Sequence, residues 1–149
     1  MLTTALLLAH AGATLFMAGV IWYVQVVHYP LMDRVDRADF PEFEAAHRRR
    51  TSLVVVPAML IELAAVLALL ALRPVGLPSW LLWAAAGLLG VIWASTFAIQ
   101  VPCHDALLRG YDPGTHSRLV RSNWIRTAGW TLRAVAALWM ILQVGLSPG

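Results

Sequence analysis

Long apolar runs alternate with shorter polar segments along the chain. Four runs, at residues 2–27, 51–72, 80–101 and 119–144, each reach the ~20 residues that a helix needs to cross a bilayer. The second and third runs are joined by the Pro/Gly turn RPVGLP at residues 73–78. The pattern predicts an all-α protein, a four-helix transmembrane bundle that forms one integral membrane domain over residues 1–149.

The other two connections resemble each other. In each half a Gln and a His end one apolar run and a second His precedes the next: Gln25, His28 and His47, then Gln100, His104 and His116. Two such hairpins side by side predict a pseudo-repeated up-down bundle with both Gln–His ends at one membrane face. These ends are either ordinary polar ends of membrane helices or two halves of one site.

The composition agrees with a membrane location. Hydrophobic residues make up 60% of the chain and charged residues 13%, and the mean hydropathy is +0.70, outside the range of soluble domains. All eleven basic residues are arginines, most of them beside apolar runs, so the pI of about 9.8 does not indicate nucleic-acid binding. We expect contact with lipid and with a lipophilic small molecule, and a homo-oligomer is compatible with the sequence. The single cysteine, Cys103, excludes an intramolecular disulfide and a two-cysteine redox relay.

The arginines are distributed unevenly between the two ends of the predicted bundle. Eight lie in or beside the two charged connections: Arg34, Arg37, Arg48, Arg49, Arg50, Arg109, Arg118 and Arg121. The connection on the opposite side carries Arg73. The positive-inside rule then predicts that the His-rich face is cytoplasmic and that both termini lie outside, in what we expect to be a bacterial inner membrane.

Histidines and a carboxylate gather at the predicted cytoplasmic helix ends. Glu44 and His47 form a Glu-x-x-His pair, the spacing with which di-metal bundles ligate a metal from one helix. With His28 and His104 they form a candidate metal site, and imidazole suits copper, iron and zinc alike. A single haem held by two histidines is the other cofactor candidate. His10 lies about 27 Å from His28 along a helix, too far to join this site.

Two charges lie deep inside apolar runs. Glu62 is in the second run and Arg133 is near the middle of the fourth, at similar depth. A lone charge there costs ~2.5–3.5 kcal/mol, so such residues tend to pair inside the bundle. We expect Glu62 and Arg133 to pair, either to fix helix packing or to form the polar floor of a cavity.

The fourth run carries a polar face beside tryptophans. Asn123, Arg126, Trp130 and Arg133 recur at spacings of three, four and three, which places them on one side of a helix. Arginines flanked by indoles suit an anionic or phenolic ligand. The candidate substrate-binding residues are Gln25, Glu62, Gln100, Trp124, Trp130 and Arg133, and the candidate catalytic residues are His104, Asn123 and Arg126.

The segment RSNWIRTAGWTLR, after the helix end F-x-x-Q-V-P-x-H at Phe97–His104, resembles small four-span proteins of the anthrone oxygenase-like family. The four-span layout covers the whole chain, and the specific part covers residues 97–133. The matching positions are Pro102, Trp124 and Arg126, whereas His104 stands near where the family has an asparagine. The resemblance implies oxygenation of a phenolic polycyclic substrate at a membrane face.

The function indicated is a membrane-embedded oxidoreductase or oxygenase acting on a lipophilic, phenolic substrate at a His-rich site. A binding or transport protein with a polar intramembrane pathway is one alternative, and a path that continued to His10 would favour it. A structural membrane subunit is the other, with small residues such as Gly12 and Gly90 allowing close helix contact.

Overall fold

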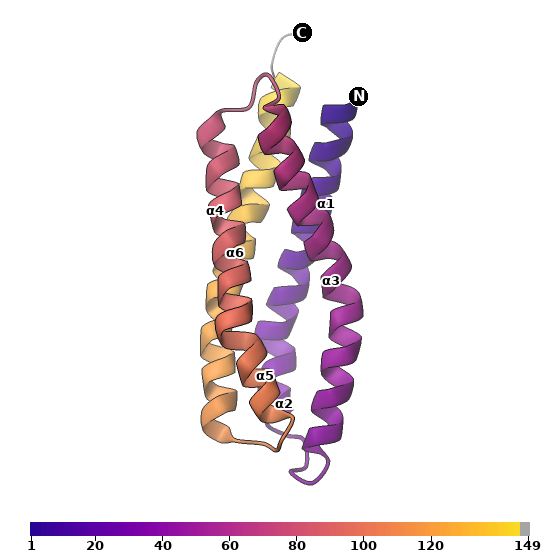
Figure 1. Ribbon diagram of the computed structural model, residues 1–149, viewed down its shortest axis with the longest axis vertical. Coiled ribbons are helices and arrows are strands. Elements are labelled where there is room, and N and C mark those ends of the chain that lie inside the picture. The colour runs from indigo at the N-terminus through magenta and orange to yellow at the C-terminus, as the bar shows by residue number, and fades with distance from the viewer. Residues whose placement is uncertain (147–149) are drawn as a thin grey trace.

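The computed structural model describes residues 1–146, and all regular structure in that range is helical. Four rods run up and down and pack into a bundle (Figure 1). In chain order the elements are α1 (Leu2–Tyr23), η1 (Val24–His28), α2 (Tyr29–Met32), α3 (Phe40–Leu72), α4 (Ser79–Ser95), η2 (Thr96–Gln100), α5 (Val101–Leu107) and α6 (Pro113–Leu146), where η marks a π-helical turn. Each rod is long and apolar enough to cross a membrane, which confirms the four predicted spans.

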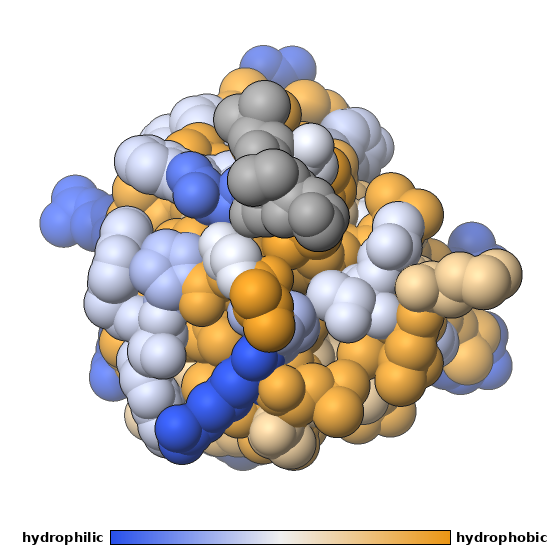
Figure 2. Space-filling view, turned by 90° about the horizontal axis from the view of Figure 1, so that it is seen from above, coloured by the Kyte–Doolittle hydropathy of each residue, from blue (hydrophilic) through white to orange (hydrophobic). Residues whose placement is uncertain are grey.

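Most apolar side chains of the rods face outward. In the apolar stretch of each rod only 28% to 33% of the residues are buried in the bundle, so the remainder is free to contact lipid. Seen from the end that holds the termini, apolar side chains reach the outer surface between hydrophilic ones (Figure 2). The chain is therefore built as an integral membrane protein.

At the charged end the helices extend further than the apolar runs indicate. The predicted boundaries at residues 27, 51, 101 and 119 are wrong, because the helices continue to Met32, begin at Phe40, continue to Leu107 and begin at Pro113. Backbone hydrogen bonding continues where the chain leaves the apolar layer, so an apolar run measures the lipid-facing length and not the helix length. Pro41 and Pro113 stand in the first turns of α3 and α6, where the missing N–H has no helical partner to lose.

Two of the rods contain a π turn two residues before a proline. η1 ends at His28 ahead of Pro30, and η2 ends at Gln100 ahead of Pro102. A proline inside a helix lacks an N–H donor and its ring collides with the preceding turn, and a wider turn relieves that collision. The turns make His28, and not Gln25, the counterpart of Gln100, so the predicted Gln–His repeat is not supported residue by residue.

Packing among the rods is uneven. α1 packs along α3 and α6, and α6 packs along α4, whereas α3 and α4 touch less extensively. Both termini lie at one end of the bundle, opposite the two charged connections (Figure 1). A cavity lies near the charged end, where α3 diverges from the rod formed by α4, η2 and α5.

Candidate functional site

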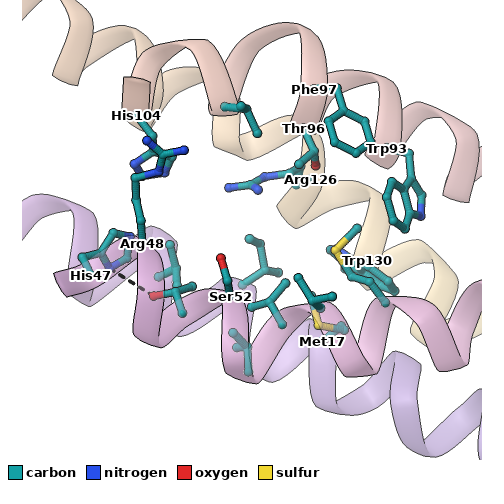
Figure 3. Close-up of a pocket in the computed structure, with 18 of the residues that line it drawn as sticks. Met17, His47, Arg48, Ser52, Trp93, Thr96, Phe97, His104, Arg126 and Trp130 are labelled. Carbon is teal, nitrogen blue, oxygen red and sulfur yellow. Dashed lines mark hydrogen bonds between the residues drawn. The ribbon is translucent and has the colours of Figure 1, made fainter. Parts of the chain in front are cut away.

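A cavity of about 240 Å³ lies inside the bundle toward its charged end, and all four rods line it (Figure 3). Its polar side chains are Tyr29, His47, Arg48, Thr51, Ser52, Thr96, His104 and Arg126. Toward the middle of the bundle its walls are apolar or aromatic, with Met17, Met59, Trp93 and Trp130. A mainly apolar pocket with a few converging polar groups is the usual form of a small-molecule site.

A chain of hydrogen bonds runs from a buried carboxylate to the cavity. Oε1 of Glu44, which is fully buried, lies 2.6 Å from Nδ1 of His104. Nε2 of the same ring lies 3.1 Å from the hydroxyl oxygen of Tyr29, whose side chain is also buried. The carboxylate accepts the proton of Nδ1, which leaves Nε2 to accept the phenolic hydrogen of Tyr29. This arrangement orients the phenol of Tyr29, and Nε2 of His104 can accept its proton.

A guanidinium completes the chain on the other side of Tyr29. Arg126 donates from Nη2 to the Tyr29 hydroxyl oxygen at 3.1 Å and from Nε to Oδ1 of Asn123 at 2.8 Å. Asn123 in turn donates to Gln25 at 2.8 Å, and Gln25 donates to the carbonyl of Val120 at 3.2 Å. Asn123 and Gln25 are buried behind the cavity, so their contacts position Arg126.

Tyr29 is the central residue that the sequence analysis missed. It follows η1 directly, and the extra residue of the π turn changes which side chains face inward: Tyr29 is buried while its neighbours Val27 and Leu31 are exposed. Its carbonyl oxygen lies 2.8 Å from Nε2 of His116 on α6. His116 is buried in the first turns of α6.

The predicted metal ligands converge, but they do not form a ligand set. The rings of His28 and His47 stack at 4.4 Å between centroids, and those of His47 and His104 lie 5.4 Å apart. Both nitrogens of His104 are engaged, with Glu44 and Tyr29, and Nδ1 of His47 lies 3.1 Å from the Thr51 hydroxyl.

Within residues 1–146 no group of three or more His, Cys, Asp or Glu side chains is arranged to hold a metal ion, so the predicted copper, iron or zinc site is not supported. Stacked rings of His28 and His47 also leave no space for a haem between them. The Glu-x-x-His pair is divided, because Glu44 reaches across to His104 on α5 while His47 lines the cavity.

The predicted pair of intramembrane charges is present. Arg133 forms an ion pair with Glu62 and also donates to the carbonyl of Ala85, and all three lie in the bundle interior. His10 joins them, with Nε2 at 3.6 Å from the Glu62 carboxylate. The pair does not line the cavity: Trp130 lines it, with the Arg133 guanidinium carbon 5.6 Å from the Trp130 ring. Of the two alternatives for the pair, its position agrees with the fixing of helix packing, and neither residue lines the cavity.

Two further predicted substrate-binding residues lie away from the cavity. Gln100 accepts from the hydroxyl of Ser95 at 3.0 Å and donates to that of Ser122 at 3.1 Å, so it ties η2 to α6. Trp124 is 49% exposed and packs edge-on against Trp22, at 5.6 Å between centroids, on the outside of the bundle.

A second polar cluster ties the two charged connections together below the cavity. The hydroxyl of Tyr111 donates to the carboxylate of Asp33, and Arg37 lies 3.5 Å above the Tyr111 ring. The hydrogen bonds from Tyr111 and Arg37 hold the pKa of Asp33 below its usual value. Burial and the bond to Asp33 raise the pKa of Tyr111. His116 links this cluster to Tyr29, because its Nδ1 lies 3.3 Å from the Tyr111 hydroxyl.

No family model, curated protein or solved structure matches the chain. The resemblance to anthrone oxygenase-like proteins therefore stays a prediction.

Proposed function

We propose that the protein is a membrane-embedded oxidoreductase or oxygenase whose substrate is lipophilic and weakly acidic, such as a phenol or a carbon acid conjugated to one. The observation that carries the proposal is the buried chain from Glu44 through His104 to Tyr29, which meets Arg126 at the cavity wall. A base backed by a carboxylate and placed beside a fixed cation suits removal of a proton and stabilisation of the anion that remains.

Each residue of the hydrogen-bond network takes part in removal of the substrate proton. The Tyr29 oxygen takes the substrate proton while its own proton moves to Nε2 of His104, 3.1 Å away. The resulting imidazolium is stabilised by the buried carboxylate of Glu44, in the way that a carboxylate supports the histidine of a hydrolase triad. Arg126, already at 3.1 Å from the Tyr29 oxygen, lies beside the substrate anion.

The anion is the electron-rich form that an oxidant attacks. With dioxygen as the oxidant and an acidic methylene group as the reacting centre, the carbanion bonds to one oxygen atom and the product, after protonation, is a hydroperoxide. Loss of water leaves a carbonyl group, so one methylene and one dioxygen give one carbonyl and one water. This is the reaction class that the resemblance in residues 97–133 implies.

The proposed location follows from the arginines of the charged end. Arg48, which lines the cavity, pairs with Asp105 at 2.7 Å, and Arg49 and Arg50 beside it are exposed. An arginine-rich end is retained in the cytoplasm by the positive-inside rule. We place the protein in a bacterial inner membrane with this end cytoplasmic and both termini outside.

Oxygen uptake tests the proposal. The protein in lipid nanodiscs is supplied with anthrone, a polycyclic ketone with an acidic methylene group, and dioxygen is followed with an electrode. Tyr29→Phe removes the proton acceptor and should lower the protein-dependent rate by about 100-fold or more. Tyr23→Phe is the matched control, since Tyr23 is 59% exposed on α1 and lies outside the cavity. Equal rates for wild type and Tyr29→Phe would refute the role of the chain.

An ion or proton pathway is the second candidate, and His10 is the observation that favours it. Nε2 of His10 lies 3.6 Å from the Glu62 carboxylate and 3.4 Å from Nη2 of Arg133, so a titratable ring adjoins the charged pair. The cavity, however, is lined by Trp130 and Met17 on that side and does not reach the pair. Proton uptake by vesicles that contain the protein, abolished by His10→Ala but not by Tyr29→Phe, would favour the pathway over the enzyme.

A further inference from the structure

A second cavity, of about 350 Å³, lies along the junction of α3 and α4. Its lining is apolar and includes Leu63, Leu67, Leu70, Ala86 and Gly90. It extends over eight residues of each helix, 63–70 and 86–93, which corresponds to about 10 Å along the bundle. We call this cavity the α3/α4 groove.

The α3/α4 groove adjoins the candidate site. Trp93 lines both the groove and the cavity that contains Tyr29 and Arg126. The indole N–H of Trp93 is buried and has no hydrogen-bond partner.

Both cavities open toward the lipid-facing side of the bundle. Val56 on α3 and Phe97 on η2 line the first cavity and are 47% and 60% exposed. Leu67 lines the groove and is 57% exposed. These residues lie within the membrane-spanning stretches, so a ligand can reach the site sideways from the bilayer without crossing the charged end.

We propose that the substrate has a flexible apolar tail, of alkyl or isoprenoid type, that lies in the α3/α4 groove while its acidic head lies beside Tyr29 and Arg126. The inference rests on the proposed function and extends it from a lipophilic substrate to a tailed one. Two features carry it: the polar groups lie in the first cavity, and the groove that adjoins this cavity at Trp93 is apolar. The ligand that matches is a phenol or enol with a chain long enough to pass Trp93.

Gly90 offers a way to fill the groove without disturbing the fold. A Cβ at Gly90 meets no atom within 4 Å, and the same is true of Gly87 one turn away, which does not line the groove. Gly90→Leu therefore fills the groove, and Gly87→Leu is its matched control on the same helix.

The test compares the binding of phenol, para-butylphenol and para-octylphenol to the three proteins in nanodiscs of one lipid composition. Partition of each phenol into lipid is the same for all three proteins. A difference in affinity between the proteins therefore measures binding of the tail in the groove. Because lipid and groove are both apolar, the tail gains packing contacts in the groove and no transfer free energy from water. We expect the octylphenol-to-phenol affinity ratio to fall severalfold in Gly90→Leu and to stay at the wild-type value in Gly87→Leu.

Equal ratios in all three proteins would overturn the inference, because the tail would then lie in bulk lipid and the groove would hold an ordinary lipid chain. That result leaves the proposed function standing if Tyr29→Phe still abolishes oxygen uptake. Conversely, a reduced ratio in Gly90→Leu together with unchanged uptake in Tyr29→Phe would support the tail site and refute the proposed chemistry.

Discussion

Replacing Arg133 with methionine should strongly destabilise the bundle while leaving the cavity intact. Arg133 and Glu62 are both fully buried, and their ion pair lies one helical turn beyond the apolar end of the cavity. Arg133→Met leaves the Glu62 carboxylate without its cationic partner. Removal of one member of a buried pair typically costs about 3–5 kcal/mol, which shifts the folding equilibrium by about two to four orders of magnitude.

The double variant Glu62→Leu, Arg133→Met separates the cost of an unpaired buried charge from the loss of the ion pair itself. Replacing a buried pair by apolar side chains of similar size is often neutral or stabilising, so most of the loss should be recovered. The free energy of unfolding is measured in mixed micelles of increasing denaturing-detergent content, with Arg49→Met, at an exposed position, as the control. The reasoning is refuted if Arg133→Met is as stable as wild type, or if the double variant is no more stable than the single one.

Two further results follow from the hydrogen-bond networks. Asn123→Ala removes the acceptor that holds Arg126 Nε at 2.8 Å, so oxygen uptake should fall at least tenfold, and Asn123→Asp, which keeps an acceptor, should retain more activity. Because the pKa of Asp33 is lowered in the folded protein, its stabilising effect is present above its ordinary value of 3.8 and is lost as pH falls through the lower folded value. Tyr111→Phe should therefore have a lower free energy of unfolding than wild type at neutral pH. In unfolding titrations this difference between the two proteins should disappear as pH falls below 3.8. A difference that persists in acid would contradict the prediction.

The membrane architecture could be predicted from the sequence because lipid imposes length and hydropathy on every span. Pairing of Glu62 with Arg133 was predictable for a related reason, since two opposite charges at one depth have no better partner. Convergence of the histidines could also be predicted, because helix ends of an up-down bundle meet at one face. In the structure the ring of His47 lies between those of His28 and His104, at 4.4 and 5.4 Å between centroids.

Helical spacing alone does not predict which side chains line the cavity or which partners they bond to. The π turn of η1 adds a residue to its turn and brings Tyr29 inward, so a face drawn at regular helical spacing misses it. The bulk of Trp130 places Arg133 outside the cavity, although both side chains belong to one helical face. The role of Glu44 depends on a residue that is distant in the sequence. Its carboxylate bonds to His104 on another rod, whereas helical spacing pairs it with His47.

The most direct test of the central claim is the ionisation state of a bound phenol. In the proposed mechanism, Arg126 and the hydrogen bonds behind Tyr29 stabilise a substrate anion. The ultraviolet spectrum of para-octylphenol bound in nanodiscs at pH 8, below the usual phenolic pKa of about 10, should therefore show the phenolate band with wild type. Arg126→Met should bind the phenol in its neutral form, and Arg49→Met should match wild type. A neutral spectrum for phenol that saturates the wild-type cavity would contradict the account.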